Sequence, residues 1–180
     1  MNLAIIGAGE SSRLKAEGLK VSKHLIELNG EHLIERIIRI GRESGLEKVF
    51  CIINSHEPVL KEYLLTNDFR IPLKLIVQDT ESSMHSLFVL SPHLTKEPFC
   101  LATTDSVFLE NEFTDFINYC ISNQNADGTL AVTQFIDDEK PLCVEIDKHN
   151  NITKFSDSKD GFSWATGGIY YFSPRIFLNS

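Results

Sequence analysis

Apolar runs alternate with amphipathic segments along the first two thirds of the chain. Four short runs are almost wholly apolar, which is typical of strands buried on both faces of a sheet. Between them, apolar residues recur every three or four positions, which predicts helices. We therefore expect strands at 2–6, 48–53, 73–77 and 99–103, and helices at 31–44, 57–65, 82–90 and 112–122. This alternation of strand and helix favours a mainly parallel sheet covered on both faces.

The pattern changes after Asp127. Strand-like segments at 129–134, 142–147, 152–155 and 168–172 follow with little helix between them, and 148–151 forms a polar turn. This half is therefore expected to be antiparallel. The whole chain is predicted to fold as one α/β domain, in three αβα layers around a mixed sheet.

Turn and cap residues mark the ends of several elements. A short extended segment at 24–28 is expected to end in a turn at Asn29-Gly30. Gly45 is expected to stop the first helix. Asn54-Ser55 offers a side-chain cap for the second helix.

Composition narrows the class of protein. The 180 residues carry a net charge of -8 and an ordinary apolar fraction of 42%, so nucleic acid is not an expected partner. No apolar run approaches the length needed to span a bilayer, and the cytoplasm is the expected location. Cys51 and Cys100 lie inside apolar strand patterns and are expected to be reduced core thiols.

The segment after the first strand is basic, although the chain as a whole is acidic. The strand leads into the small residues Gly7-Ala8-Gly9 and two hydroxyls, Ser11 and Ser12. The cations Arg13, Lys15, Lys20 and Lys23 then follow. Glycines allow a ligand to approach backbone N–H groups, and phosphate suits both those groups and the cations. The loop 7–23 therefore predicts a phosphate-binding cradle.

The carboxyl ends of parallel strands lie at one edge of a sheet, where ligands bind. This rule places 7–12, 78–83 and 104–106 on a single rim. A dinucleotide-binding site does not fit, because Ser12 replaces the third glycine and the second strand lacks the acid that follows it. The GxxxxGK[ST] pattern of P-loop proteins is absent from the sequence.

The segment from Gly7 to Leu14, then Lys23, then L-x-x-L-N-G-E-x-L-I-E-R, resembles the nucleotidyltransferases related to sugar-1-phosphate pyrophosphorylases. Ser22 stands where that family usually has proline. The resemblance implies the nucleotide-diphospho-sugar transferase-like fold and a Mg²⁺-dependent transfer of a nucleotidyl group. It also implies an NTP and a phosphorylated small molecule, such as a sugar 1-phosphate, as substrates.

The resemblance assigns roles to single residues. Arg13 and Lys23 become catalytic candidates that bind the triphosphate and orient the attacking phosphate, and Asp105 becomes the Mg²⁺ ligand. Nucleotide-binding candidates are Gly7, Ala8, Gly9, Glu10, Ser11, Ser12, Gln78, Ser82 and Ser83. Acceptor-binding candidates are Glu145 and Gly168.

Two other functions remain open on the sequence. A glycosyltransferase would use a nucleotide sugar, although Asp105-Ser106-Val107 lacks the second acid of an Asp-x-Asp pair. A non-catalytic module would bind a nucleotide without turnover. The family usually carries a second metal-binding Asp further along a longer chain, so 1–180 is expected to be truncated at its C-terminal end. The base, the acceptor and the oligomeric state stay undetermined.

Overall fold

A computed structural model of the chain describes residues 1–8, 22–123, 125–136 and 141–178. These residues form one eight-stranded sheet and a short hairpin. Four strands match the predicted parallel set: β1 (Asn2–Gly7), β4 (Val49–Ile53), β5 (Leu73–Val77) and β6 (Phe99–Thr103). They lie in the order β5-β4-β1-β6, and all three pairings are parallel. The expected fold class is confirmed.

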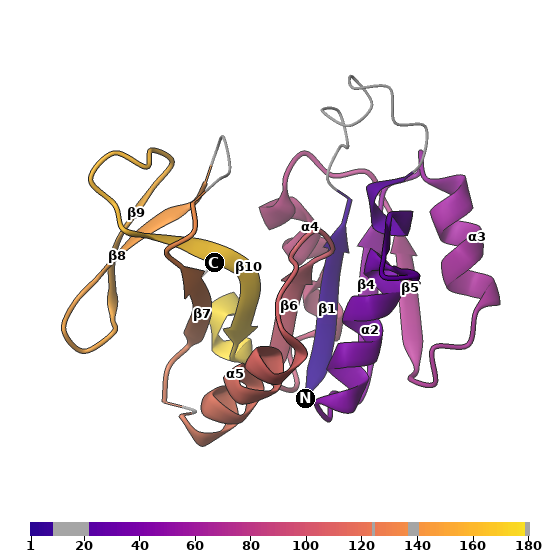
Figure 1. Cartoon of the computed structure of the whole chain (residues 1–180). Helices are drawn as coiled ribbons and strands as arrows, with labels where there is room; N and C mark the ends of the chain where they lie inside the picture. The colour runs from indigo at the N-terminus through magenta and orange to yellow at the C-terminus, as the bar shows by residue number, and fades with distance from the viewer. Residues whose placement is uncertain (9–21, 124, 137–140, 179–180) are drawn as a thin grey trace.

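The remaining strands form an antiparallel half (Figure 1). β10 (Trp164–Phe172) pairs antiparallel with β6 and so joins the two halves. β7 (Gly128–Thr133) and β8 (Cys143–Ile146) both pair with β10, and β9 (Ile152–Ser156) pairs with β8. β10 is longer than the predicted strand, because it begins at Trp164 rather than at Gly168.

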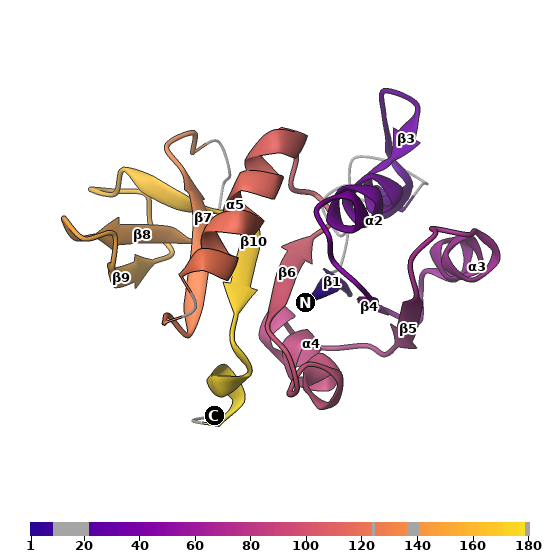
Figure 2. The same ribbon diagram turned by 90° about the horizontal axis from the view of Figure 1, so that it is seen from below.

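Helices cover both faces of the parallel strands (Figure 2). On one face, α2 (Leu33–Glu43), α3 (Pro58–Thr66) and α5 (Glu110–Ser122) pack against alternate strand residues such as Leu3 and Ile5. On the other face, α4 (Ser83–Leu90) packs against the residues between them, Ala4 and Ile6. Short 3-10 segments lie at Lys23–Leu25 (η1), Ser91–His93 (η2) and Pro174–Phe177 (η3). The result is the predicted three-layer arrangement.

Three local predictions are wrong. The segment 24–28, expected to be extended, begins within the 3-10 segment η1 and is a strand only at its end. The first helix begins at Leu33, because Glu31–His32 (β3) pairs with Glu27–Leu28 (β2) in a hairpin. Asn29 and Gly30 both have positive φ, 55° and 83°, as a tight hairpin turn requires. The second helix has Glu57 at its cap position without a side-chain hydrogen bond, and Ser55 instead donates to Asp79.

The predicted core thiols are confirmed. The four cysteines, all within the described ranges, are buried free thiols. Burial raises the pKa of the Cys51 thiol to about 12, so this thiol stays protonated at neutral pH. No helix among the described residues combines the length and apolar character needed to cross a bilayer.

Candidate active site

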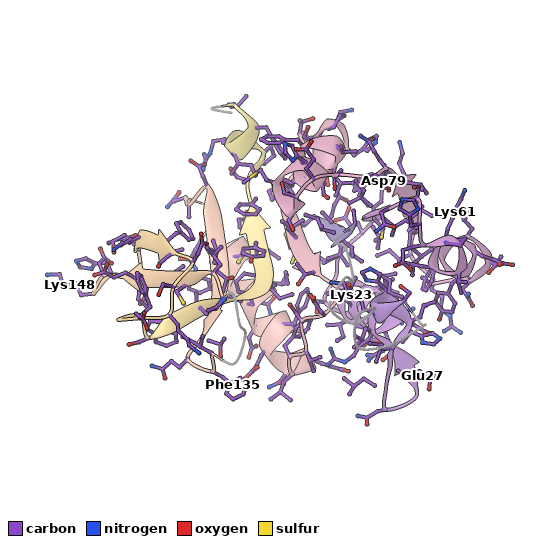
Figure 3. The ribbon with its side chains drawn as sticks, turned by 90° about the horizontal axis from the view of Figure 1, so that it is seen from above. Lys23, Glu27, Lys61, Asp79, Phe135 and Lys148 are labelled. Carbon is purple, nitrogen blue, oxygen red and sulfur yellow. The ribbon has the colours of Figure 1, made fainter. Side chains whose placement is uncertain are left out.

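The carboxyl ends of the four parallel strands meet at one edge of the sheet, and Figure 3 looks down on that edge. Gly7 and Ala8, residues 78–83 and residues 104–106 all follow these strand ends. The predicted rim is therefore confirmed where it is described. Its remaining members, Gly9, Glu10, Ser11 and Ser12, lie outside the described residues, as does the catalytic candidate Arg13, and their roles stay predictions.

An ion pair between Lys23 and Asp105 occupies this rim. Lys23 begins η1, Asp105 follows β6, and Lys23 Nζ lies 3.0 Å from Asp105 Oδ2. The Lys23 side chain is 21% exposed and that of Asp105 is 57% exposed. Two residues separated by 82 positions in sequence thus meet, and their charges remain accessible to a ligand.

The environment of Asp105 favours its charged form. Burial alone would raise the pKa of Asp105, but the Lys23 charge and hydrogen bonds from Lys23 and Thr103 outweigh burial. The net effect holds the pKa of this carboxyl below its usual range. Asp105 is therefore ionised at neutral pH, as a carboxylate ligand of a metal ion must be.

His24, which was not predicted from the sequence, follows Lys23 and contacts Thr104, the residue before Asp105. Its side chain is only 1% exposed, and its Nδ1 forms a short hydrogen bond with Thr104 Oγ1. Burial, and then the neighbouring Lys23 charge, lower the pKa of His24 to about 4. The imidazole is therefore neutral at physiological pH.

Gly168 brings the antiparallel half against the Asp105 turn. Its φ is +76°, and a Cβ added there would lie 2.0 Å from Ser106 Oγ and 2.7 Å from Thr103 Oγ1. The pairing of β10 with β7 shifts register between Thr166 and Tyr170, around this glycine. A side chain at position 168 would therefore push on the turn that carries Asp105.

A cleft of about 1050 Å³ opens beside this contact, between the two halves. Its walls come from the Asp105 turn and α5 on one side and from β7, β10 and the segment after β7 on the other. Predicted site residues Ser83, Asp105 and Gly168 line it. So do residues that the sequence analysis did not name, including Phe108, Glu112 and Phe135. Phe135, labelled in Figure 3, is 77% exposed.

Other predicted residues lie elsewhere on the rim or away from it. Gln78 is exposed directly after β5, and its N–H donates to the Ile53 carbonyl oxygen at 2.9 Å. Ser82 caps α4 by accepting a hydrogen bond from His85 N–H. Glu145 lies on β8 opposite Lys154, exposed and not among the described residues that line the cleft.

A further contact holds the rim beside Gln78. Asp79 accepts hydrogen bonds from the Ser55 N–H and hydroxyl, both at 2.7 Å. The first of these bonds, then the second, lowers the pKa of the Asp79 carboxyl. The loops after β4 and β5 are therefore held together beside Gln78, the residue that the family resemblance implies as a contact of the nucleobase. This contact was not predicted from the sequence.

Comparison with known proteins identifies the family. Residues 3–163 match the model described as MobA-like NTP transferase domain. The chain belongs to this family. Over 180 residues, this NTP transferase domain is also 21% identical to the bifunctional protein GlmU of Methanococcus aeolicus. That match covers 98% of the chain and 41% of GlmU, so the chain spans about two fifths of the length of the curated relative it matches.

Solved structures share the fold of this NTP transferase domain. A putative glucose-1-phosphate thymidylyltransferase from Bacillus anthracis superimposes with a TM-score of 0.86 at 17% identity, over 99% of this chain and 73% of that one. The inositol-1-phosphate CTP transferase from T. maritima gives 0.83 at 20% identity, over 98% and 72%. The resemblance drawn from the sequence is thus confirmed at the level of family and fold.

The rim has donors that suit the expected Mg²⁺. Asp105 offers an ionised, accessible carboxylate, and the hydroxyls of Thr103 and Ser106 lie beside it, 3.0 Å apart. Among the described residues no group of three or more His, Cys, Asp or Glu side chains could form a complete cage. Mg²⁺ in nucleotide sites takes one or two carboxylates, with substrate phosphates and water completing its shell, so the residues present fit this ion.

Proposed function

We propose that this chain transfers a nucleotidyl group from an NTP to a phosphorylated small molecule, with release of pyrophosphate. The observation that supports this most strongly is the accessible Lys23–Asp105 pair on the rim, next to a cleft between the two halves. A sugar 1-phosphate or related phosphate is the proposed acceptor class. The names of the solved relatives, which include glucose-1-phosphate and inositol-1-phosphate transferases, support that choice.

The reaction requires positioning and charge neutralisation more than proton transfer. The acceptor phosphate is already ionised at neutral pH, so its oxygen attacks the α-phosphorus without a general base. The neutral, buried His24 is consistent with this, since it has no exposed face from which to take a proton. Two anions must meet, and the leaving pyrophosphate must be stabilised.

Lys23 and Asp105 have complementary roles in this proposal. The Lys23 ammonium orients the α-phosphate and the attacking phosphate as a point charge. Asp105 would hold Mg²⁺, which supplies charge neutralisation at phosphate oxygens when bound. Arg13 is proposed to bind the leaving phosphates through its two-pronged guanidinium. Gln78 is proposed to contact the base, because an amide both donates and accepts hydrogen bonds.

The test is a pyrophosphate-release assay with a panel of NTPs and phosphorylated acceptors. Lys23→Met keeps the aliphatic stem and removes the charge, and Asp105→Asn removes the carboxylate. Each is expected to lower kcat by about 10²–10³-fold, the usual cost of removing one charge-stabilising group. The matched control is Lys61→Met, since Lys61 is exposed on α3, which does not line the cleft, and should leave kcat unchanged.

The same assay separates the proposal from its rivals. A glycosyltransferase would release a nucleoside diphosphate from a nucleotide sugar and no pyrophosphate from an NTP. A nucleotide-binding module would show a thermal shift with an NTP and no turnover. Wild-type turnover in a folded Lys23→Met variant would contradict the role given to Lys23.

A further inference from the structure

One buried polar contact lies directly behind the proposed catalytic pair. His24 and Thr104 are 1% and 2% exposed, and Nδ1 of the imidazole is bonded to Oγ1 of the threonine. Each residue is the immediate sequence neighbour of a member of the pair, Lys23 in one case and Asp105 in the other. The His24–Thr104 bond thus joins the same two segments as the Lys23–Asp105 ion pair, but it is buried where the ion pair is accessible.

The imidazole also contacts the end of the neighbouring strand. A Cβ added to Gly7 would lie 3.4 Å from His24 Cε1, so the ring packs on the backbone where β1 ends. β1 and β6 are adjacent, with Ile6 opposite Thr103. His24 therefore touches the carboxyl ends of both central strands, and η1, which carries Lys23, is fastened to them at this point.

We propose that His24 is a positioning residue, which holds Lys23 beside Asp105 on the rim, where both groups are proposed to act in nucleotidyl transfer. This inference rests on the proposed function. The physical reason is that η1 spans only Lys23–Leu25 and is too short to fix a lysine by its own hydrogen bonds. A buried hydrogen bond between two otherwise inaccessible polar groups is costly to break, because each is then left unpaired.

The test uses changes at both ends of the bond. His24→Leu removes the hydrogen bond and replaces the imidazole with an apolar side chain of similar size. Thr104→Val removes the hydroxyl and keeps the shape. His24→Asn places an amide where it can still bond to Thr104. Because displacement by about 1 Å can cost 10²-fold in rate, we expect His24→Leu to lower kcat by about 10- to 10²-fold. The KM for NTP should change by less than roughly threefold, since ground-state binding is shared among other groups.

Two comparisons separate positioning from general destabilisation. His24→Asn should recover most of the kcat that His24→Leu loses. The His24→Leu/Thr104→Val double variant should be no slower than His24→Leu, since both substitutions break the same hydrogen bond. Thr114→Val is the matched control, because it removes a hydroxyl pair with Ser44 (2.9 Å) between α2 and α5. It should lower the melting temperature without lowering kcat.

A crystal structure of His24→Leu provides a readout that does not depend on activity. The expected result is a Lys23 Nζ–Asp105 Oδ2 separation beyond about 4 Å, the limit of an ion pair, in place of 3.0 Å. An unchanged separation would overturn the inference, even if the wild type proved inactive on every acceptor and the proposed function failed. Wild-type kcat in His24→Leu, or an equal loss in Thr114→Val, would overturn it as well.

Discussion

The two halves of the sheet differ in how thoroughly they are buried. Every residue of β4 is buried, and so is all of β1 apart from Asn2. β9, in the antiparallel half, has three exposed residues of five. The hydrophobic clusters that the described residues form are centred on the parallel strands. The parallel half is therefore a conventional core with helices on both faces, and the antiparallel half is a thinner wall attached to it through β10.

The two halves supply different parts of the proposed site. Lys23, His24 and Asp105 are attached to the ends of β1 and β6, which are fixed on both faces by the core. The outer wall of the cleft comes from β7, β10 and the segment that includes Phe135. Catalytic groups held by a rigid scaffold and a substrate wall on less constrained segments are a common arrangement in enzymes. In the proposed reaction the first half carries out the phosphate chemistry, and the second half selects the acceptor.

The largest expected difference between the halves is in stability. Ile5→Ala removes a fully buried side chain from β1 and should lower the free energy of unfolding by about 2–5 kcal/mol. Phe155→Ala on β9, where the side chain is 53% exposed, should cost less than about 1 kcal/mol because little apolar surface is lost. Urea unfolding measures both. Equal losses would show that the second half is as tightly packed as the first.

The next largest effect concerns the contact that joins the halves. Gly168→Ala places a Cβ into Ser106 and Thr103 at a positive φ and should cost about 2–4 kcal/mol through backbone strain and steric overlap. It should also slow turnover, because the Asp105 turn must move.

Gly161→Ala is the matched control for this change. Its φ is +80°, with nothing within 4 Å of the added Cβ. The substitution should therefore cost only the strain of a positive φ, about 1–2 kcal/mol. Urea unfolding and kcat are measured for both variants. If Gly168→Ala were as mild as Gly161→Ala, the close contact between the halves would not be important for the site.

Acid should lower the free energy of unfolding, because His24, in the parallel half, must be protonated. Its pKa is about 4 in the folded protein against 6.5 for an ordinary histidine, so the unfolded state binds more protons between these values. Stability is fully present above pH 6.5 and is lost as the pH falls towards 4. Between pH 7.5 and pH 5 this group should lower the free energy of unfolding by about 2 kcal/mol.

Urea unfolding of His24→Asn at both pH values isolates that contribution, since the variant should lose less stability in acid than the wild type. His149→Asn, an exposed substitution in the antiparallel half, should follow the wild type. An identical pH dependence in His24→Asn and the wild type would refute the assignment of the acid sensitivity to this residue.

The secondary structure was largely predictable from the sequence, and the site only in part. β5 and β6 have the predicted bounds, because short apolar runs between polar ends have few alternatives. The hairpin before α2 was missed because Glu31 and His32 precede an amphipathic repeat and fit a helix by pattern alone. His24 was missed because its partner lies 80 residues away. Alternation placed Glu145 on a strand but could not show that Glu145 is not among the described residues that line the cleft.

The smallest expected effect tests acceptor selection directly. Phe135→Ala should raise the KM for the acceptor by about 2- to 10-fold, the equivalent of about 0.5–1.5 kcal/mol of aromatic contact. The KM for NTP should stay constant. Gln78→Ala, on the other side of the rim, should show the reverse pattern. Steady-state kinetics with each substrate varied in turn would expose a shared role if both KM values rose in either variant.

In the proposed reaction, the Lys23–Asp105 rim cleaves an NTP between its α- and β-phosphates. Parallel reactions with α-³²P- and γ-³²P-labelled NTP, wild type and Asp105→Asn, test this most directly. The α-label is expected to move to the phosphorylated acceptor and the γ-label to leave as pyrophosphate, and Asp105→Asn should slow both by about 10²–10³-fold. Transfer of the γ-label to the acceptor, or an Asp105→Asn rate equal to that of the wild type, would contradict it.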